Sequence, residues 1–516
     1  MKYEPWKPVV DALVAALSHS EPTEADMQAV VTQLARLGDL LQAHPNDPDN
    51  ASIRSYTLMS VDLPSFFVLL GSNQPTLVER AVKVIHLLLR PLNYTALDQD
   101  YREYIFQGLQ AGNPETVLLG IRELSKYDPS SDPAFGPYYL PWLLKLLESD
   151  HGEVVRASQE LLVRVCQQPA NFENLITTDN QEIMAALMKS STVCFRIYDL
   201  FVDIALQSSD QFERCRAETV IFQDLGQEAT SDDLLRRLSA LEVYYKLCET
   251  TYGYAFLQEL NIFPAYTELL ADPEPRLETI LVQCSAVQFF ARLIDYDHVD
   301  FAQLEASLGL FDLMQTLLTT SPTQDVKNAV VIALGILGLR NRGLILLNNH
   351  NKLVADFVDE YNQSDRQYAL VCLQTLAKIF EPRDPITEKI CHITSKVYGR
   401  IRATKAIKQW VTLAKMDMDD ISPACLQVLE GMAVYEWGRK IMQRTHEFMT
   451  YLLDRNSNRN YINKKWKYSL VNILHEKDQE AASPVFENSV HQLLDKYVKE
   501  GPFYVNREAA VMLESQ

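Results

Sequence analysis

The sequence predicts an all-α fold in which pairs of helices stack into a superhelical solenoid. Three observations support this prediction: a pattern of paired helices recurs along the chain, apolar residues follow helical spacing within the pairs, and glycine is scarce. The chain has 17 glycines in 516 residues, which is about 3% against a usual share of about 7%. An enzyme that is built on glycine-rich turns would normally contain more.

The recurring unit is an apolar helix, a short polar loop and a second helix with a small or medium residue near its start. Residues 143–147, 148–152 and 154–158 form one such unit. Anchor residues in successive second helices lie 37 to 55 positions apart and about 43 on average, within the roughly 40–47 residues of HEAT and armadillo repeats. The anchors are Ala81, Gly120, Ala157, Ile197, Ser239, Ser285, Ala329, Ala369, Ala424 and Tyr468.

Apolar residues in the second helices recur at helical intervals, as in Val193, Ile197, Leu200 and Ile204. One helix pair cannot bury its apolar face alone, so stacked pairs are needed to close a continuous core. Almost no stretch shows the strict alternation of a half-buried strand. Several separate helical domains remain an alternative, although no long Gly/Ser linker divides the repeats.

The repeat pattern also predicts the organisation of the chain. We expect residues 1–60 to form an N-terminal cap that fits the repeat poorly, residues 61–500 to hold about ten repeats, and residues 501–516 to form a C-terminal tail. Asp128–Pro137 contains three prolines and should be a loop. Arg400–Asp420 lies in the longest gap between anchors and should hold an extra helix or a longer loop.

The chain carries 48 basic and 68 acidic residues, a formal net charge of −20, which disfavours non-specific binding of duplex nucleic acid. Residues 400–477 run against this balance, with 14 basic and 8 acidic residues. Lysines and aromatic rings interleaved in this way either surround a helical core as solvated charges, which we favour, or clamp a nucleic acid strand. The densest run contains Arg455, Arg459, Lys464, Lys465 and Lys467, interleaved with Tyr461, Trp466 and Tyr468.

No membrane or export signal is expected. The longest apolar run, Ala329–Leu339, is shorter than the roughly 20 residues that span a bilayer, and the first residues lack the apolar stretch of a signal peptide. The eight cysteines are at least 19 positions apart, so no CxxC motif exists. We therefore expect buried free thiols and a cytoplasmic location, with the nucleus as an open alternative.

No catalytic motif emerges from the sequence. His446-Glu447 and His475-Glu476 begin like zinc-protease motifs but lack the second histidine. A phosphate-binding loop and a GxSxG elbow are also missing. Gly335 and Gly338 are predicted to permit close helix packing. The sequence thus predicts a protein without enzymatic activity, cofactor or metal.

The surface of the second helices is the remaining candidate site, because second helices line the concave side of a solenoid, where partners bind. Three stripes there predict a mixed polar groove for a folded protein partner, although each stripe can equally be solvated without a partner. The first stripe is Arg196, Asp199 and Asp203, the second is Gln288, Arg292 and Asp295, and the third is Asn328 and Val331, continued by Gly335 and Gly338.

Three stretches carry a family resemblance: residues 193–200 with the core Arg196-x-Tyr198-Asp199, residues 334–338, and a C-terminal block. With them, the sequence resembles the proteasome non-ATPase regulatory subunit five family, loosely from about residue 60 to 505. The C-terminal block is the most specific. It comprises Phe448, Tyr451, Asp454-Arg455, Lys467-Tyr468-x-Leu470-Val471 and the ending Glu500-Gly501-Pro502-Phe503-Tyr504-Val505.

The resemblance implies a helical solenoid that is not an enzyme and that serves as a chaperone of base assembly in the proteasome regulatory particle. It implies binding to the C-terminal domain of one base ATPase subunit, regulatory particle triple-A ATPase one, together with other base precursor subunits. The bound chaperone would hinder premature docking on the core particle. The alternatives are a solenoid adaptor for another protein cargo and, less favoured, a nucleic-acid binder that uses the C-terminal basic run.

Overall fold

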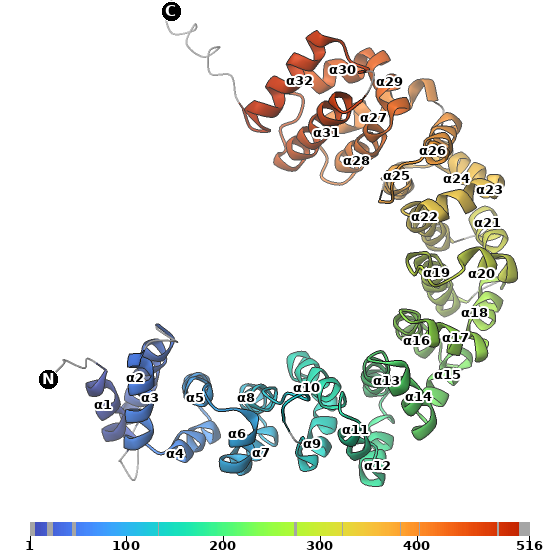
Figure 1. The fold of residues 1–516 in the computed structure, drawn as a ribbon. Helices are drawn as coiled ribbons and strands as arrows, with labels where there is room; N and C mark the ends of the chain where they lie inside the picture. Colours follow the sequence, from blue (N-terminus) through green and yellow to red (C-terminus); the bar gives the residue numbers. More distant parts are fainter. Residues whose placement is uncertain are drawn as a thin grey trace, which may run out of the picture. The chain divides into compact units, whose positions relative to one another are not determined.

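The computed structural model describes residues 6–17, 24–43, 48–132, 134–272, 276–321, 323–381, 383–401, 403–481 and 484–504. Every regular element in these residues is a helix, which confirms the all-α prediction. The chain divides into two compact units, unit 1 (Met1–Leu225) and unit 2 (Gly226–Gln516). Within each unit, helices stack in two layers (Figure 1).

Unit 1 contains α-helices and three short 3-10 helices, labelled η. In chain order they are α1 (Lys7–Leu17), α2 (Glu24–Ala43), α3 (Pro48–Ser60), α4 (Leu63–Val68), η1 (Leu69–Gly71), α5 (Pro75–Leu89), α6 (Tyr94–Asp100), α7 (Arg102–Leu109), α8 (Pro114–Leu124), η2 (Pro137–Tyr139), α9 (Leu140–Lys145), η3 (Leu146–Glu148), α10 (Gly152–Val165), α11 (Pro169–Leu175), α12 (Thr178–Leu187), α13 (Ser191–Ala205) and α14 (Ser209–Glu218).

The helix α15 (Ile221–Gln227) spans the boundary, and unit 2 follows. Its elements are η4 (Glu228–Thr230), α16 (Leu234–Leu247), α17 (Thr251–Glu259), α18 (Ile262–Leu270), α19 (Leu277–Arg292), η5 (Leu293–Asp295), α20 (Phe301–Leu308), α21 (Leu310–Thr320), α22 (Gln324–Gly338), α23 (Asn341–Asn349), α24 (Asn351–Gln363), α25 (Arg366–Phe380), α26 (Glu388–Arg400), α27 (Ala403–Lys415), α28 (Ile421–Val434), α29 (Glu436–Arg444), α30 (His446–Leu453), α31 (Tyr461–Gln479) and α32 (Asn488–Glu500).

The second helices of the repeats form one continuous layer in each unit. In unit 1, α2, α5, α8, α10 and α13 pack against one another in this order. In unit 2, the same succession runs through α16, α19, α22, α25, α28 and α31. We call these the second-helix layers, and the remaining helices cover their other side.

The apolar pattern explains why the second helices sit inside the stack. In α28, Ala424, Cys425, Leu429 and Met432 are buried, so residues on several sides of the helix are enclosed. A helix that is apolar nearly all round is stable only when neighbours surround it. By length and composition, residues Leu277–Asp295 could also cross a membrane, but 56% of this stretch is buried inside the fold, which is typical of a core helix.

Glycines allow neighbouring second helices to approach closely. A Cβ atom added to Gly338 would lie 2.6 Å from Cγ1 of Ile379, and one added to Gly335 would lie 3.1 Å from Cδ of Lys378. Both partners belong to α25, so these glycines bring α22 and α25 together. The predicted role of Gly335 and Gly338 in helix packing is confirmed.

Basic side chains join the ends of successive second helices in unit 1. Nζ of Lys126 donates a hydrogen bond to the carbonyl oxygen of Leu89 at 2.8 Å, at the end of α5. Nη1 of Arg164 donates to the carbonyl oxygen of Ser125 at 2.5 Å, at the end of α8. The last carbonyls of a helix lack intrahelical donors, so these contacts satisfy them and couple one repeat to the next.

The two segments that were predicted to be irregular, residues 128–137 and 400–420, agree with the prediction. The described residues between Asp128 and Gly136 contain no helix, and a 3-10 helix begins at Pro137. The segment from Arg400 to Asp420 contains an additional helix, α27. All eight cysteines are free, and six of them are buried, whereas Cys284 and Cys391 are half-buried.

Candidate functional site

The first predicted stripe lines a shallow groove in unit 1. Arg196, Asp199 and Asp203 stand on α13 because Ile197, Leu200 and Ile204 turn the opposite face into the core. The groove lies between α10 and α13 and has a volume of about 560 Å³. It is lined by Gly152, Val155, Arg156, Gln159, Glu160, Val163, Arg196, Asp199 and Asp203.

Hydrogen bonds fix the polar groups of this groove. Nε2 of Gln159 donates to a carboxylate oxygen of Asp199 at 2.6 Å and to one of Asp203 at 3.1 Å. Nη1 of Arg196 donates to the carbonyl oxygens of Leu147 and Ser149 at 2.6 and 3.0 Å, where η3 ends. The groove therefore presents acidic oxygens in defined positions, while Arg196 also holds the preceding repeat in place.

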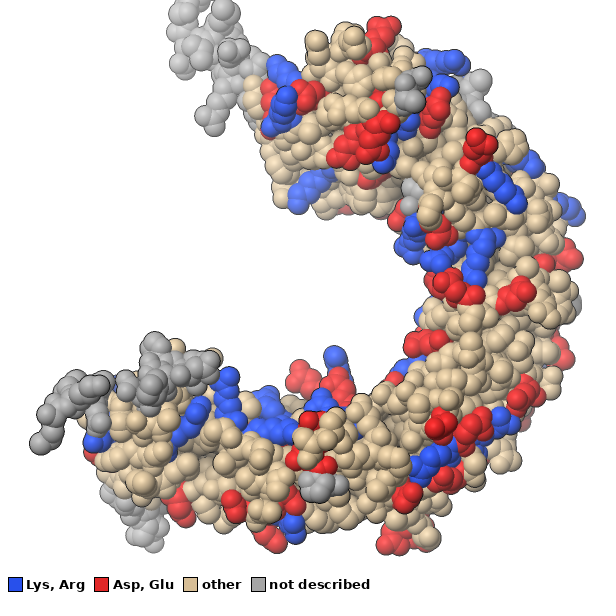
Figure 2. All heavy atoms as spheres, in the orientation of Figure 1, with Lys and Arg blue, Asp and Glu red and all other residues tan. Residues whose placement is uncertain are grey.

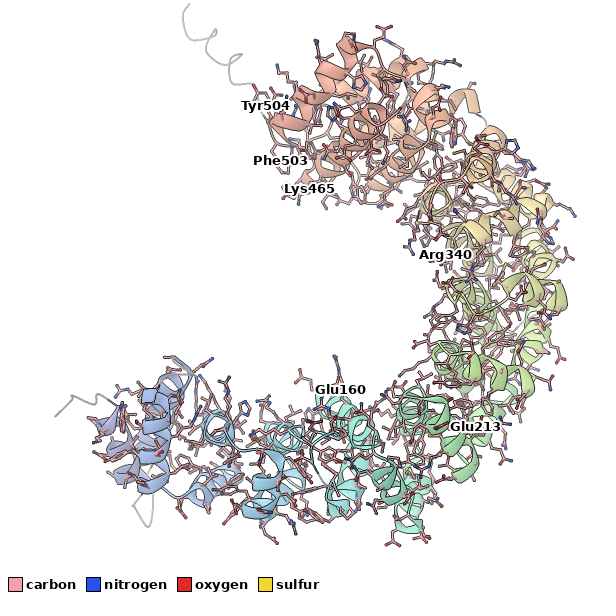
Figure 3. The ribbon with its side chains drawn as sticks, in the orientation of Figure 1. Glu160, Glu213, Arg340, Lys465, Phe503 and Tyr504 are labelled. Atoms are coloured by element: carbon pink, nitrogen blue, oxygen red, sulfur yellow. The ribbon has the colours of Figure 1, made fainter. Side chains whose placement is uncertain are left out.

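The exposed rim of the groove belongs to α10. Arg156 and Glu160 form an ion pair of 2.8 Å, and their side chains are 82% and 62% exposed. Figure 2 shows acidic and basic side chains together on this part of unit 1, and Figure 3 shows Glu160 on α10 and Glu213 on α14 on different sides of the unit. Charges of both signs are thus available to a partner on the second-helix layer.

The second stripe is less open than the sequence suggests. Arg292 on α19 donates from Nη1 to Oε1 of Glu242 at 3.0 Å, and its guanidinium lies 3.6 Å from the ring centre of Tyr245. Both partners lie on α16, so Arg292 ties two second helices together. Gln288 is half-buried, and Asp295 is exposed at the end of η5.

The prediction that Val331 of the third stripe contributes to a binding surface is wrong. This side chain is fully buried, and the carbonyl oxygen of Val331 accepts a hydrogen bond from Oγ1 of Thr375 at 2.8 Å. Gly335 and Gly338 face α25 as well. The reason is that α22 is apolar on nearly every side, so small residues there mark an interface between helices. Asn328 alone remains half-exposed.

A second groove, which the sequence did not reveal, runs across α25, α28 and α31 in unit 2. Its volume is about 600 Å³. Its lining includes side chains of both charges, apolar side chains and the half-buried ring of Trp466. The lining residues are Gln374, Ala377, Lys378, Glu381, Gln427, Glu430, Gly431, Val434, Trp466 and Ile473.

The carboxylate of Glu430 lies within this second groove. Oγ of Ser469 donates to it at 2.6 Å, and burial together with the charge of Glu381 raises its pKa above the usual value. The signal in the sequence is the stripe of Gln374 and Lys378 at helical spacing in α25, continued by Glu381 directly after the helix. Polar residues with this spacing on a core helix indicate an open side of the helix.

Two residues of the C-terminal basic run, Arg455 and Lys467, have structural roles, and the expectation that Lys467 is solvated is wrong. Lys467 is 2% exposed. Its Nζ donates to the carbonyl oxygens of Tyr451 and Asp454 and to Oγ of Ser457, each at 2.6 Å. The ammonium group thus closes the end of α30.

Arg455 has a similar role. Its Nη1 donates to the carbonyl oxygen of Gly501 at 2.8 Å, and its Nη2 donates to the carbonyl oxygen of Tyr497 at 3.2 Å and to Oε2 of Glu500 at 2.8 Å. The residues of the C-terminal block that carry the family resemblance therefore fasten α30, α31 and α32 to one another. Lys465 and Arg459 remain exposed, and Lys464 is half-buried.

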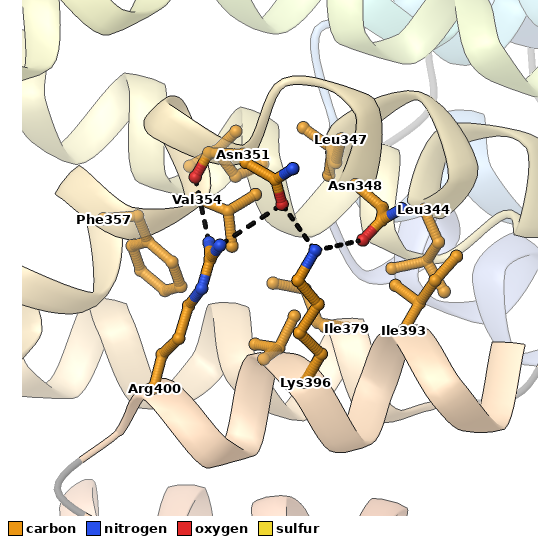
Figure 4. Close-up of a pocket in the computed structure, with 12 residues that line it drawn as sticks. Leu344, Leu347, Asn348, Asn351, Val354, Phe357, Ile379, Ile393, Lys396 and Arg400 are labelled. Carbon is orange, nitrogen blue, oxygen red and sulfur yellow. Dashed lines mark hydrogen bonds between the residues drawn. The ribbon is translucent and has the colours of Figure 1, made fainter.

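One further cavity in unit 2 is very small. A cavity among α22 to α26 has a volume of about 20 Å³ and mainly apolar walls, which is space for one water molecule (Figure 4). At its mouth, Nζ of Lys396 donates to the side chains of Asn348 and Asn351 at 3.2 and 2.7 Å. No group of three or more His, Cys, Asp or Glu side chains in the described part of the chain could hold a metal ion.

One solved structure and two curated proteins illustrate what the chain is similar to. The nuclear-import protein Kap95p, solved with RanGDP, shares the fold with a TM-score of 0.56 and 11% identity, over 95% of this chain and 66% of that chain. The 26S proteasome non-ATPase regulatory subunit 5 of Bos taurus is 22% identical over 499 residues, which cover 95% of this chain and 97% of the relative.

The protein of the same name from Homo sapiens is 21% identical over 502 residues, with the same coverage of both chains. The sequence profile of the family described as "Proteasome non-ATPase 26S subunit" matches residues 12–516. This match spans both units and includes the C-terminal block. The chain therefore belongs to the proteasome non-ATPase 26S subunit family.

Proposed function

We propose that this protein is an assembly chaperone of the base of the proteasome regulatory particle. In this proposal it binds the C-terminal domain of one base ATPase subunit, regulatory particle triple-A ATPase one, within a precursor that holds other base subunits. The bound chaperone hinders premature docking of the ATPase ring on the core particle. The protein catalyses no reaction and acts in the cytoplasm.

The observation that carries the proposal is the end-to-end similarity to relatives named as proteasome non-ATPase regulatory subunits. A helical-repeat protein suits this role because its second-helix layers offer extended surfaces that are already folded. Because such a surface is already ordered, binding a partner costs it little conformational entropy. The groove with Asp199 and Asp203 and the groove with Lys378 and Trp466 are the two candidate contact areas.

The test mixes the purified full-length chain with each of the six isolated base ATPase C-terminal domains and analyses each mixture by size-exclusion chromatography. We expect the domain of triple-A ATPase one to co-elute at a one-to-one ratio, without nucleotide. Co-elution of none of the six would contradict the proposal. Binding of an unrelated protein cargo instead would favour the adaptor alternative.

The same experiment examines the groove in unit 1. Asp199→Arg with Asp203→Arg should weaken binding at least tenfold, because it reverses two half-exposed charges. The thermal midpoint should fall only slightly, through the loss of the two hydrogen bonds from Nε2 of Gln159. The matched control is Glu182→Arg with Glu213→Arg, two exposed acidic residues on α12 and α14. Equal binding by both variants would show that the interface lies outside this groove. The proposed partner would not be affected by that result.

A further inference from the structure

A cluster of exposed aromatic side chains lies at the C-terminal end of unit 2. Tyr461 opens α31, and Phe503 and Tyr504 follow α32. Their exposed fractions are 58%, 45% and 45%. The rings of Tyr461 and Phe503 stack with centroids 4.7 Å apart and planes 5° apart. We call Tyr461, Phe503 and Tyr504 the aromatic platform, and Figure 3 shows Phe503 and Tyr504 near Lys465 on the same edge of the unit.

The segment that carries Phe503 and Tyr504 is held firmly. Arg455 donates to the backbone of Tyr497 and Gly501, and its guanidinium lies 3.5 Å from the ring centre of Tyr497. The same guanidinium lies 5.5 Å from the ring centre of Tyr504. Gly501 has a φ of 79°, which lets the chain turn sharply after α32.

The loop before Tyr461 is held by Asp417. The carboxylate of this residue accepts hydrogen bonds from the backbone N–H groups of Arg459 and Asn460 and from the side chains of Asn458 and Asn463. These donors lower the pKa of Asp417, so the carboxylate stays charged. Both halves of the aromatic platform are thus prearranged, and a ligand would bind it without ordering a loop.

One cation contacts the platform, and two more lie close to it in the sequence. Nζ of Lys465 lies 4.5 Å from the ring centre of Tyr461, and Lys464 is its neighbour on α31. Arg459 lies in the loop before α31 and is exposed. In the described part of the chain, these three side chains have no ion-pair partner, whereas Arg455 pairs with Glu500. We call Arg459, Lys464 and Lys465 the cationic rim.

We infer that the aromatic platform and its cationic rim dock an extended acidic segment of a partner protein, with one aromatic or aliphatic side chain as its anchor. Apolar rings in water favour an apolar ligand group, and unpaired cations favour carboxylates. The chain as a whole carries a formal net charge of −20, so this rim of unpaired cations attracts an acidic ligand more than the average surface of the chain does. This inference goes beyond the proposed function and does not depend on which protein fills the two grooves.

A nucleic acid strand fits the same surface less well. Single strands also stack bases on aromatic rings, but they need a positive groove that follows several phosphates. Lys467 and Arg455 are occupied by the backbone of the fold, so only the three cations of the rim remain for contacts with phosphates.

The test measures fluorescence anisotropy of a labelled 12-residue peptide of Glu and Asp with Trp and Leu at its centre. It is titrated with the full-length chain at near-physiological salt. We expect saturable binding that Phe503→Ser with Lys465→Glu weakens at least tenfold without lowering the thermal midpoint. The matched control, Leu277→Ser with Lys352→Glu, alters an exposed leucine and an exposed lysine of the same unit and should bind like the wild type.

Four results would overturn the inference. The first is the absence of saturable peptide binding, and the second is equal binding by the Phe503→Ser, Lys465→Glu variant. The third is tighter binding of a labelled 12-nucleotide oligo-dT than of the peptide, which would indicate a nucleic acid site. The fourth is at least tenfold tighter peptide binding by a chain that ends at Tyr504, which would assign the platform to residues 505–516 of the chain itself.

Discussion

Lys467 donates three hydrogen bonds at the end of α30 while its side chain is almost completely buried. Burial penalises the charged ammonium group and lowers the pKa of Lys467 from 10.5 to about 7. A lysine in a run of basic residues would ordinarily be solvated. Here the chain bends so that two backbone carbonyls and one hydroxyl enclose Nζ.

Lys467 should therefore make stability depend on pH. Between about pH 7 and pH 10.5, the unfolded chain binds a proton that the folded chain releases, so the free energy of unfolding rises with pH in this window. The thermal midpoint of the wild type should rise between pH 7 and pH 9 relative to that of Lys467→Met. A difference between the two proteins that is constant over this range would contradict the lowered pKa.

At the scale of single residues, the sequence predicted some positions of the candidate site and missed others for physical reasons. Arg196, Asp199 and Asp203 were placed correctly on one face because Ile197 and Leu200 define the opposite, buried face of α13. The environment of Lys467 could not be predicted, because it depends on a loop whose course is determined by Asp417, a residue about 50 positions earlier.

At the scale of elements, three glycines recur at the third position of a helix that follows a second helix. They are Gly253 in α17, Gly343 in α23 and Gly438 in α29. A Cβ atom at each would lie 2.0–2.1 Å from the carbonyl oxygen six residues earlier. These sharp turns allow the next helix to start directly against the end of the second helix.

Gly343→Ala should therefore destabilise unit 2. The added Cβ would lie 2.1 Å from the carbonyl oxygen of Leu337, so the backbone must shift, at a cost of about 1–3 kcal/mol. Gly399→Ala is the matched control, because a Cβ atom added there would meet no neighbouring atom within 4 Å; in a helix this change should stabilise by about 0.5–1 kcal/mol. Urea unfolding followed by circular dichroism measures both changes, and equal stability of the two variants would refute the steric argument.

The fold could be predicted from the sequence because its signals are local. The repeat of paired helices, the lack of strand-like alternation and the additional helix α27 can each be recognised in short stretches of the chain. The prediction that the third stripe binds a partner is wrong for Val331 on α22. A helix that is apolar on nearly all sides gives no sequence signal for which of its sides is exposed. The groove with Trp466 depends on three helices from three repeats. The packing between repeats determines which faces of these helices are exposed, so the sequence of one helix does not predict the groove.

At the scale of the whole molecule, the two units offer several surfaces that are formed before any partner arrives. The grooves with Asp199 and Glu430 and the aromatic platform each carry charges in fixed positions. Binding energy at such interfaces is usually concentrated in a few aromatic or arginine anchors. Trp466 and Phe503 are exposed or half-exposed rings that suit this role in unit 2.

If the protein is a chaperone of base assembly, as we propose, it accompanies base precursors and is absent from the mature proteasome. Affinity purification of the tagged full-length chain from cells, followed by quantitative mass spectrometry, distinguishes a chaperone from a resident subunit. We expect stoichiometric triple-A ATPase one together with other base subunits, and core-particle subunits only at background level. Recovery of core-particle subunits in stoichiometric amount with the chain would show that the protein is a resident subunit of the mature proteasome and not an assembly chaperone.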